Sequence, residues 1–370
     1  MRVCGHESPA ALVSVKGAHD HKPKAQGRTR KSPNAKAEDT NTAVTSIAST
    51  IIPKLGRNKI SVAISFLIFA VAAFTLYRLL RDVDFDKVVA AIEAQSLARV
   101  AIAGGFVVAG YVTLTFYDVF ALRTIGWHKV PYPVAALASF TSSTIGHSLG
   151  ASVLTGGLIR LRIYSVWGLS VADVAKIALI TGMTFVLGNA FLLGGAVSYA
   201  PQAASAVDHL PLWVNRAIGL SGLFGIAFYL VWLAPGPRAI GRSGWRVVLP
   251  NLRFTLLQIA IGTLDLTLVT CAMWTLMPST PAVGFVTVLV TFLTATLLGT
   301  ASHTPGGLGV IEATMLLGLP QFQKEELLAA LLTFRALYFL LPLCFAALSL
   351  ALRELRMIAK GDPIGRDPDR

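Results

Sequence analysis

Four ionisable side chains stand inside long apolar stretches of this sequence: Asp118, Asp265, Glu312 and Arg335. An Asp, Lys or Arg at the centre of a membrane helix costs about 2.5–3.5 kcal/mol on insertion scales. Arg335, in LLTFRALYFLLPL, is too deep in its stretch to reach either end. Its guanidinium needs a carboxylate partner, for which Glu312 is the natural candidate, or a phosphate that its planar fork can bind. Ion pairs that hold helices together and a polar cavity that meets a phosphate both remain open. Asp265 and Glu312 are also candidate groups for proton coupling.

A second set of candidates lies between Gly146 and Ser165, in GHSLGASVLTGGLIRLRIYS, where glycine, histidine and arginine interrupt apolar sequence. Histidine titrates near neutral pH and can bind a headgroup phosphate, although a lone histidine is more often a packing residue. Two arginines at a membrane boundary are more often topology signals than ligands. The candidates for binding a lipid headgroup are His147, Ser148, Arg160 and Arg162, and the candidates for a flexible break are Gly156 and Gly157.

This pattern has a weak echo later in the chain, with a spacer of different length. TSSTIG followed by TGGLIRLRI resembles TATLLG followed by PGGLGVIEA, which pairs Gly156 and Gly157 with Gly306 and Gly307 and adds His303 to the headgroup candidates. Broken segments in the two halves of a membrane protein indicate a transport site. Helix N-termini that open after each glycine pair would add N–H donors for an anion. Chance recurrence of glycine pairs in a glycine-rich membrane protein is the alternative.

The composition indicates which elements must hold these residues. Of 370 residues, 54% are hydrophobic and 14% are charged, and the mean hydropathy is +0.65, whereas about a quarter of the residues in soluble domains are charged. Several apolar stretches reach the roughly 20 residues that span a bilayer as a helix. We therefore expect an all-α integral membrane protein with about eight membrane segments, including re-entrant or broken helices and an inverted repeat. The expected segments are 60–80, 100–122, 134–158, 171–199, 213–233, 252–277, 283–302 with the short stretch that follows it, and 327–352.

Loop charges predict how these segments are threaded, because Lys and Arg concentrate in cytoplasmic loops. Residues 1–56 form a basic zone that cannot bury a core, and we expect a disordered cytoplasmic tail unless the start codon is mis-assigned. Residues 57–358 form the membrane domain, and 359–370 form a second short cytoplasmic tail. The segments agree with these loop positions only under two conditions. Segment 134–158 must be a re-entrant hairpin on the cytoplasmic side, and the segment after Pro305 must complete a crossing with its neighbours. The predicted location is the bacterial inner membrane, with both termini in the cytoplasm.

The net charge of +13 does not indicate nucleic acid, because the excess lies in the tail and in short loops, where it reports topology and attraction to anionic lipid. No P-loop, GxSxG, HExxH or zinc-ligand spacing appears. We therefore expect a transporter rather than an enzyme, without catalytic residues, cofactor or metal. Membrane phospholipids are the expected partners, and an oligomer is compatible with the sequence.

Three motifs carry a family resemblance. GHSLGASVLTGGLIRLRIYSVWGLS, TPGGLGVIEATML and FRALYFLLPL resemble, in this order, motifs of the lysylphosphatidylglycerol synthase/flippase (multiple peptide resistance factor) family. The resemblance covers residues 60–357, which correspond to the membrane half of that family. In its two-domain relatives, a cytoplasmic domain transfers an amino acid to phosphatidylglycerol and the membrane domain moves the product between leaflets. This sequence ends at Arg370, so we expect a stand-alone member without the synthase half.

The resemblance implies a lipid translocase, in which a polar groove admits a charged headgroup while the acyl chains stay in lipid. The implied substrate is a phosphate-bearing lipid, such as aminoacyl-phosphatidylglycerol or a polyprenyl-phosphate carrier. Two alternatives remain: a membrane-embedded enzyme that acts on lipid headgroups, and a non-transporting membrane partner of a separate lipid-modifying synthase. The second alternative predicts internal pairing of Asp118, Asp265, Glu312 and Arg335.

Overall fold

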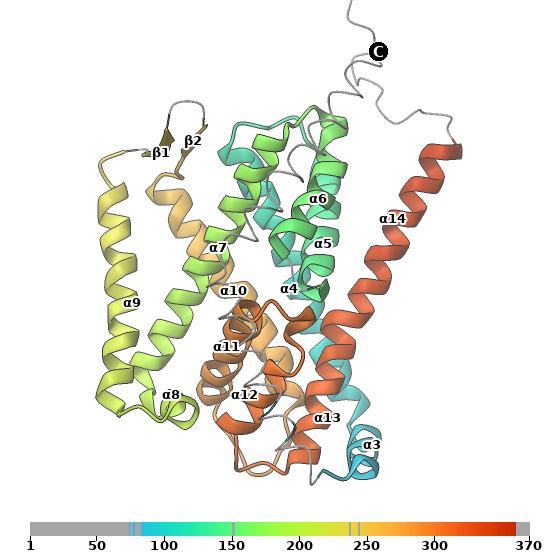
Figure 1. Ribbon diagram of the computed structural model, residues 1–370, viewed down its shortest axis with the longest axis vertical. Coiled ribbons are helices and arrows are strands. Elements are labelled where there is room, and N and C mark those ends of the chain that lie inside the picture. The colour runs from blue at the N-terminus through green and yellow to red at the C-terminus, as the bar shows by residue number, and fades with distance from the viewer. Residues whose placement is uncertain are drawn as a thin grey trace, which may run out of the picture. The chain divides into compact units, whose positions relative to one another are not determined.

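The computed structural model describes residues 83–149, 152–236, 238–242 and 245–359, together with Phe74 and Tyr77 (Figure 1). The expected tail at 1–56, the expected span at 60–80 apart from those two residues, and the chain beyond Ala359 lie outside this description. The described part is helical apart from one pair of short strands. It confirms the expectation of an all-α membrane protein.

Five helices of the described part are long and apolar enough to cross a membrane, and they coincide with five expected segments. They are α4 (Leu97–Thr124), α7 (Val171–Tyr199), α9 (Leu212–Leu233), α10 (Leu252–Leu276) and a continuous helix made of α13 (Lys324–Arg335), a π-helical turn η3 (Ala336–Leu340) and α14 (Leu341–Ala359). Apolar residues cover all sides of these helices, as expected where one side packs on protein and the other faces lipid. The last helix changes its winding directly after Arg335, where η3 begins.

The expected re-entrant segment at 134–158 consists of two helices that pack on each other, α5 (Tyr132–Leu149) and α6 (Ser152–Tyr164), which we call hairpin A. Ala135 near the start of α5 and Tyr164 at the end of α6 belong to one buried cluster with the end of α4. Hairpin A therefore enters and leaves at the same end of the bundle, as the loop charges predicted. Its second helix runs past the expected limit at Leu158.

Hairpin B consists of α11 (Phe285–Ala301), the short turn η2 (Pro305–Gly307) and α12 (Val310–Gly318). Met277 at the end of α10, Val288 early in α11 and Leu319 directly after α12 share one buried cluster. The segment after Pro305 thus folds back beside α11 and does not complete a crossing, which corrects the sequence-based expectation. The cause is a reversal of the backbone at the glycines of η2.

The two hairpins enter the bundle from opposite ends. The short helices α3 (Phe85–Glu93) and α8 (Pro201–Asp208) lie at the end where hairpin B enters, which we call the α3 end (Figure 1). The antiparallel strands β1 (Ala239–Arg242) and β2 (Trp245–Val248) lie at the other end, the β end, where hairpin A enters. Opposed entry is the arrangement that an inverted repeat requires.

Glycines bring the spanning helices close together. Where α7 crosses α10, a Cβ on Gly188 would lie 2.5 Å from the carbonyl carbon of Gly262. Where α7 crosses α9, a Cβ on Gly219 would lie 2.8 Å from the carbonyl oxygen of Gly194. Membrane helices associate by such close contact because lipid supplies no hydrophobic force between them.

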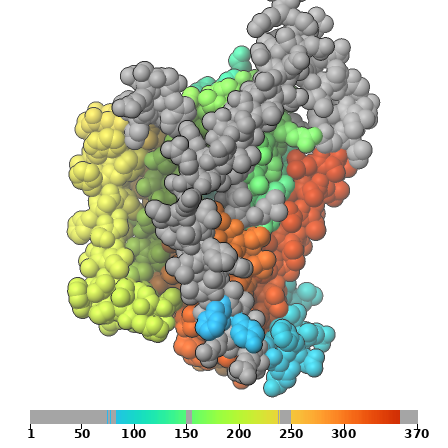
Figure 2. All heavy atoms as spheres, in the orientation of Figure 1, coloured from blue at the N-terminus to red at the C-terminus, as the bar shows by residue number. Residues whose placement is uncertain are grey.

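Two outer helices present large apolar side chains to their surroundings. Figure 2 shows α9 along one edge of the described bundle and α14 along the opposite edge. On α9, Trp213, Phe224 and Phe228 are between 71% and 75% exposed, and on α14 Phe345 and Leu348 are also exposed. These surfaces are suited to contact lipid acyl chains.

Candidate functional site at the two helical hairpins

Arg335, at the end of α13, reaches across to hairpin B. Its Nε donates to Oε1 of Glu312, and its Nη1 donates to the carbonyl oxygen of Gly306 at 2.9 Å. The side chains of Arg335 and Glu312 are mostly buried, 13% and 9% exposed respectively. The guanidinium carbon also lies 5.5 Å from the centroid of the Phe339 ring. The predicted pairing of Arg335 with Glu312 is confirmed.

These partners do not use all the donors of Arg335. Its Nη2 is buried and has no hydrogen-bond partner among the residues that the structure describes. Leaving a buried donor without an acceptor is costly, and an anionic oxygen is the acceptor that a guanidinium binds most strongly. The site thus combines an internal anion, Glu312, with spare donors beside it.

The turn that Arg335 holds is built from glycines in the left-handed region of the backbone. Gly306, Gly307 and Gly309 have φ values of 57°, 64° and 80°, which other L-residues rarely adopt. The turn is also crowded, since a Cβ on Gly306 would lie 3.3 Å from Nη1 of Arg335. The backbone N–H of Gly309 donates to Oε2 of Glu312 at 2.8 Å, where α12 begins. One carboxylate therefore joins the turn, α12 and α13.

Gly156 and Gly157 do not form an equivalent turn. Because α6 begins at Ser152, both glycines are helical and no helix N-terminus opens after Gly157, contrary to the expectation from the sequence echo. Gly156 instead allows close packing inside hairpin A, since a Cβ there would lie 3.1 Å from the carbonyl oxygen of Ser142 on α5. A Cβ on Gly157 would meet nothing within 4 Å. The connection between the two helices of hairpin A lies outside the described residues.

Hairpin A carries a second buried ion pair. Arg160 on α6 donates to the carboxylate of Asp118 on α4 through Nη2 at 2.8 Å and through Nε at 3.0 and 3.1 Å. The hydroxyl of Tyr164 donates to the same carboxylate at 2.8 Å. Asp118 is fully buried and Arg160 is nearly so. The sequence indicated both charged residues but not their pairing, and headgroup binding by Arg160 stays a prediction.

The other predicted headgroup residues divide between the two hairpins. His147 is partly buried on α5, within electrostatic range of Arg160. The neighbouring Ser148 has a buried hydroxyl oxygen with no hydrogen-bond partner in the described part of the chain. Arg162 is exposed towards the end of α6. His303 lies instead at the turn of hairpin B, with a φ of 54°. The structure thus places His147 near the ion pair of hairpin A and His303 beside the glycines of hairpin B.

Asp265 lies at the middle of α10 and is 4% exposed. The hydroxyl of Tyr117 donates to its Oδ2 at 3.1 Å. Earlier on the same helix, α4, the hydroxyl of Tyr111 donates to the carbonyl oxygen of Tyr338 in η3 at 2.9 Å. Sequence analysis missed these tyrosines, although a phenol inside an apolar stretch that also carries Asp118 was an available signal.

The two hairpins share one plan. In each, the second helix carries a buried charge that pairs with a neighbouring spanning helix: Arg160 with Asp118 on the helix before hairpin A, and Glu312 with Arg335 on the helix after hairpin B. The charge on the hairpin is positive in hairpin A and negative in hairpin B, and the partner helix precedes hairpin A but follows hairpin B in the chain. Because α5 packs on η2 and on η3, the hairpins also meet inside the bundle.

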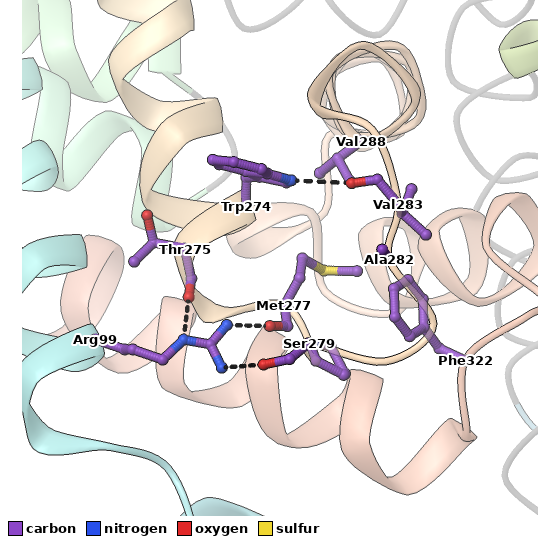
Figure 3. A pocket seen from close by; sticks show the side chains of 10 residues that line it. Arg99, Trp274, Thr275, Met277, Ser279, Ala282, Val283, Val288 and Phe322 are labelled. Atoms are coloured by element: carbon purple, nitrogen blue, oxygen red, sulfur yellow. Dashed lines mark hydrogen bonds between the residues drawn. The ribbon is translucent and has the colours of Figure 1, made fainter.

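A cavity of about 310 Å³ lies at the α3 end, away from these residues (Figure 3). Its lining includes Arg99, Trp274, Met277, Val283 and Phe322. Nε of Arg99 donates to the carbonyl oxygen of Thr275 at 3.0 Å, and Nη1 donates to the hydroxyl of Ser279 at 3.2 Å. Nη2 donates to the carbonyl oxygen of Met277. Sequence analysis missed Arg99, which holds the last carbonyls of α10, where helical partners run out.

Comparisons with known proteins agree with a membrane protein and add no activity. No family model matches the sequence. An uncharacterized protein of Synechocystis sp., slr0712, is 29% identical over 266 residues, which cover 70% of this chain and 82% of that protein. The inner membrane protein YbhN of Escherichia coli is 29% identical over 297 residues, which cover 79% of this chain and 91% of that protein. Membership of the lysylphosphatidylglycerol synthase/flippase family stays a prediction, and the chain is a multi-pass membrane protein similar to these two proteins.

Proposed function

We propose that this protein is a lipid translocase that moves a phosphate-bearing lipid, such as aminoacyl-phosphatidylglycerol, between membrane leaflets. The observation that carries the proposal is the position of Arg335: it is mostly buried beside the broken turn of hairpin B, and one of its guanidinium nitrogens has no hydrogen-bond partner in the part of the chain that the structure describes. A flippase needs a cation of this kind at membrane depth, because a headgroup phosphate must leave water to cross the bilayer.

The chemistry of the exchange follows from the contacts of Arg335. A phosphate offers oxygens to Nη2 and also competes with the Glu312 carboxylate for Nε. Displacing Glu312 would release its bond to the Gly309 N–H and so free the start of α12. Binding of a headgroup is thereby linked to movement of the turn at Gly306. The exposed apolar flanks of α9 and α14 leave room for acyl chains to remain in lipid.

We place the protein in the inner membrane, as the name of the Escherichia coli relative suggests. The β end faces the cytoplasm in this proposal, since Arg238, Arg242, Arg246 and Arg253 gather in the connection from α9 to α10. Both termini are then cytoplasmic. Attachment of a reporter enzyme to residue 370 tests this orientation directly.

Lipid movement in proteoliposomes tests the function. Fluorescent phosphatidylglycerol and its lysylated form would be placed in one leaflet, and their appearance in the other would be followed for wild type, Arg335→Ala and Glu312→Gln. We expect movement by wild type and loss in Arg335→Ala. Arg253→Ala, which removes an exposed arginine at the start of α10, is the matched control and should retain activity. Absence of movement with folded wild-type protein would reject the proposal for these lipids.

One observation favours a second candidate, a membrane partner of a separate lipid-modifying synthase. Asp118, Glu312 and Arg335 are all paired inside the bundle, as a non-transporting scaffold would need, whereas Asp265, the fourth residue that this alternative expects to be paired, is bound only by the Tyr117 hydroxyl among the described residues. This alternative expects no lipid movement by the protein alone and co-purification with a lipid-modifying enzyme. An embedded lipid-headgroup enzyme would instead convert the lysylated lipid in the same vesicles, and Arg335→Ala would abolish turnover.

A further inference from the structure

Asp265 differs from the other buried carboxylates of the described bundle because it has no cationic partner. Asp118 on α4 is bound by Arg160, and Glu312 on α12 is bound by Arg335. Asp265 is 4% exposed and receives one hydrogen bond, from the Tyr117 hydroxyl to Oδ2. Its Oδ1 is buried and has no hydrogen-bond partner among the described residues. A carboxylate in this position would keep its full charge in an apolar interior with a single donor.

The surroundings of Oδ1 suit a carboxylic acid. Gly110 of α4 faces this oxygen, and a Cβ built there would lie 3.8 Å from it. A hydrogen atom on Oδ1 fits beside a glycine, and Tyr117 continues to donate to Oδ2 in the protonated form. The same geometry does not suit a metal ion, since the described residues contain no group of three or more His, Cys, Asp or Glu side chains that could hold one.

The titratable groups that face Asp265 are tyrosines: Tyr117 and Tyr111 from α4, and Tyr338 from η3. α11, which also packs on α10, carries no titratable side chain. On α7, Asp173 and Lys176 lie near the first turn and pair with each other at 3.5 Å. On α13, Arg335 is bound to Glu312. On α9, which also packs on α10, Arg216 lies near the start of the helix. Within the described residues, no ion pair joins any of these cations to Asp265.

We propose that Asp265 is a proton-binding site in the middle of the bundle and that its proton couples lipid movement to a proton gradient. The step is simple: a hydronium ion that reaches the site gives one proton to the carboxylate, its O–H bond breaks as an O–H bond forms at Oδ1, and a water molecule is left. Glu312 was an equal candidate from the sequence. The structure separates the two residues, because Glu312 is held by an arginine and Asp265 is not.

A chain of contacts connects this site to the broken turn. Asp265 bonds Tyr117 on α4, and Tyr111 on the same helix bonds the carbonyl oxygen of Tyr338 in the π-helical turn. That turn begins directly after Arg335, and π-helical turns often mark functional positions. In this proposal, helix α4 is the link through which protonation of Asp265 acts on the helix that carries Arg335.

Proton binding is tested without any transport assay. Infrared spectra of the purified full-length protein would be recorded across a pH series, following the carbonyl band of a protonated carboxylic acid. We expect one such band to titrate in wild type above the pH range in which exposed Asp and Glu side chains are protonated, and to be lost in Asp265→Asn. It should persist in Glu312→Gln, the matched control that removes an arginine-bound carboxylate. Tyr117→Phe keeps the carboxyl group and should shift the midpoint of the band, which provides a second variant should Asp265→Asn fail to fold.

The outcomes are decisive for the site. A titrating band that is the same in wild type and Asp265→Asn, the absence of such a band at every pH, or a band that never titrates would each overturn the proposal. The coupling part rests on the proposed lipid translocation and is measured separately. An imposed pH gradient across the proteoliposomes should change the rate of lipid movement in wild type and leave it unchanged in Asp265→Asn. Equal responses would overturn the coupling, whereas failure of wild type to move lipid would reject the translocase and leave the infrared result standing.

Discussion

The carboxylate of Asp118 on α4 and the guanidinium of Arg160 on α6 are joined by hydrogen bonds at 2.8, 3.0 and 3.1 Å, and both are buried. Tyr164, one turn further along α6, completes the contact. The pair fixes hairpin A against the spanning helix that precedes it in the chain. It also determines which substitutions in this region the fold can tolerate.

Asp118→Asn should destabilise the protein strongly, because it leaves the Arg160 charge buried without a partner. Removing one member of a buried ion pair costs about 3–5 kcal/mol. The double variant Asp118→Asn with Arg160→Met should lose less stability than Asp118→Asn alone, since neither member of the buried ion pair remains charged. Thermal unfolding of the purified protein in detergent measures both, with Asp86→Asn on the exposed face of α3 as the control. A melting temperature of Asp118→Asn equal to that of wild type would contradict the role given to the pair.

Gly262→Ala should weaken the crossing of α7 and α10. Its Cβ would lie 2.5 Å from the carbonyl oxygen of Thr184, so the backbones must move apart. Overpacking of this kind costs about 1–3 kcal/mol. The matched control is Gly182→Ala on α7, where a Cβ meets nothing within 4 Å. We expect the control to unfold at the wild-type temperature or slightly above it, and equal loss in both variants would argue against the close crossing.

Gly306→Ala and Gly157→Ala should behave differently, although the sequence echo pairs the two positions. Gly306 has a φ of 57°, where an alanine is strained by about 1–2 kcal/mol, and its Cβ would also press on Arg335. Gly157 is helical and has open space. The first variant should lower the melting temperature and slow lipid movement, and the second should do neither. Similar effects of the two substitutions on melting temperature and lipid movement would contradict the different roles given to Gly306 and Gly157.

Arg99→Ala should loosen the connection between α10 and hairpin B. A hydrogen bond from a charged donor stabilises a protein by about 1.5–3 kcal/mol. Because Arg99 is partly exposed, we expect Arg99→Ala to lose stability near the lower end of that range. Arg99→Lys should recover only part of the lost stability, because an ammonium group cannot reproduce the three hydrogen bonds that the planar guanidinium donates. Hydrogen exchange of the backbone amides around Met277 reports the change, with the exposed Arg123→Ala at the other end of α4 as the control. Unchanged exchange in Arg99→Ala would show that the end of α10 does not depend on it.

Much of the fold follows from the sequence alone. The spanning helices were predictable because a backbone in lipid must satisfy its own hydrogen bonds, which makes a long apolar stretch a helix. Hairpin A was predictable because the positions of Lys and Arg in the loops leave no other threading. The pairing of Glu312 with Arg335 was predictable because an arginine so far from either helix end requires an anion.

Other features depended on contacts between distant parts of the chain. Hairpin B folds back because glycines in η2 adopt positive φ, whereas the similar Gly156 and Gly157 stay helical, and the glycine pair itself is the same in both places. Asp118 binds Arg160, 42 residues away, and Asp265 receives its one hydrogen bond from Tyr117, 148 residues away.

The sequence by itself therefore determined that this is a helical membrane protein, that Asp118, Asp265, Glu312 and Arg335 lie within apolar stretches, and that Arg335 requires a partner. Hydrophobicity and charge act at each residue, so these properties can be read locally. Only the tertiary structure decided that an arginine neutralises Asp118, whereas Asp265 has no cationic partner among the described residues. That difference is set by which helices pack against each other, and a partner's charge or hydroxyl acts only when packing brings it within hydrogen-bonding distance.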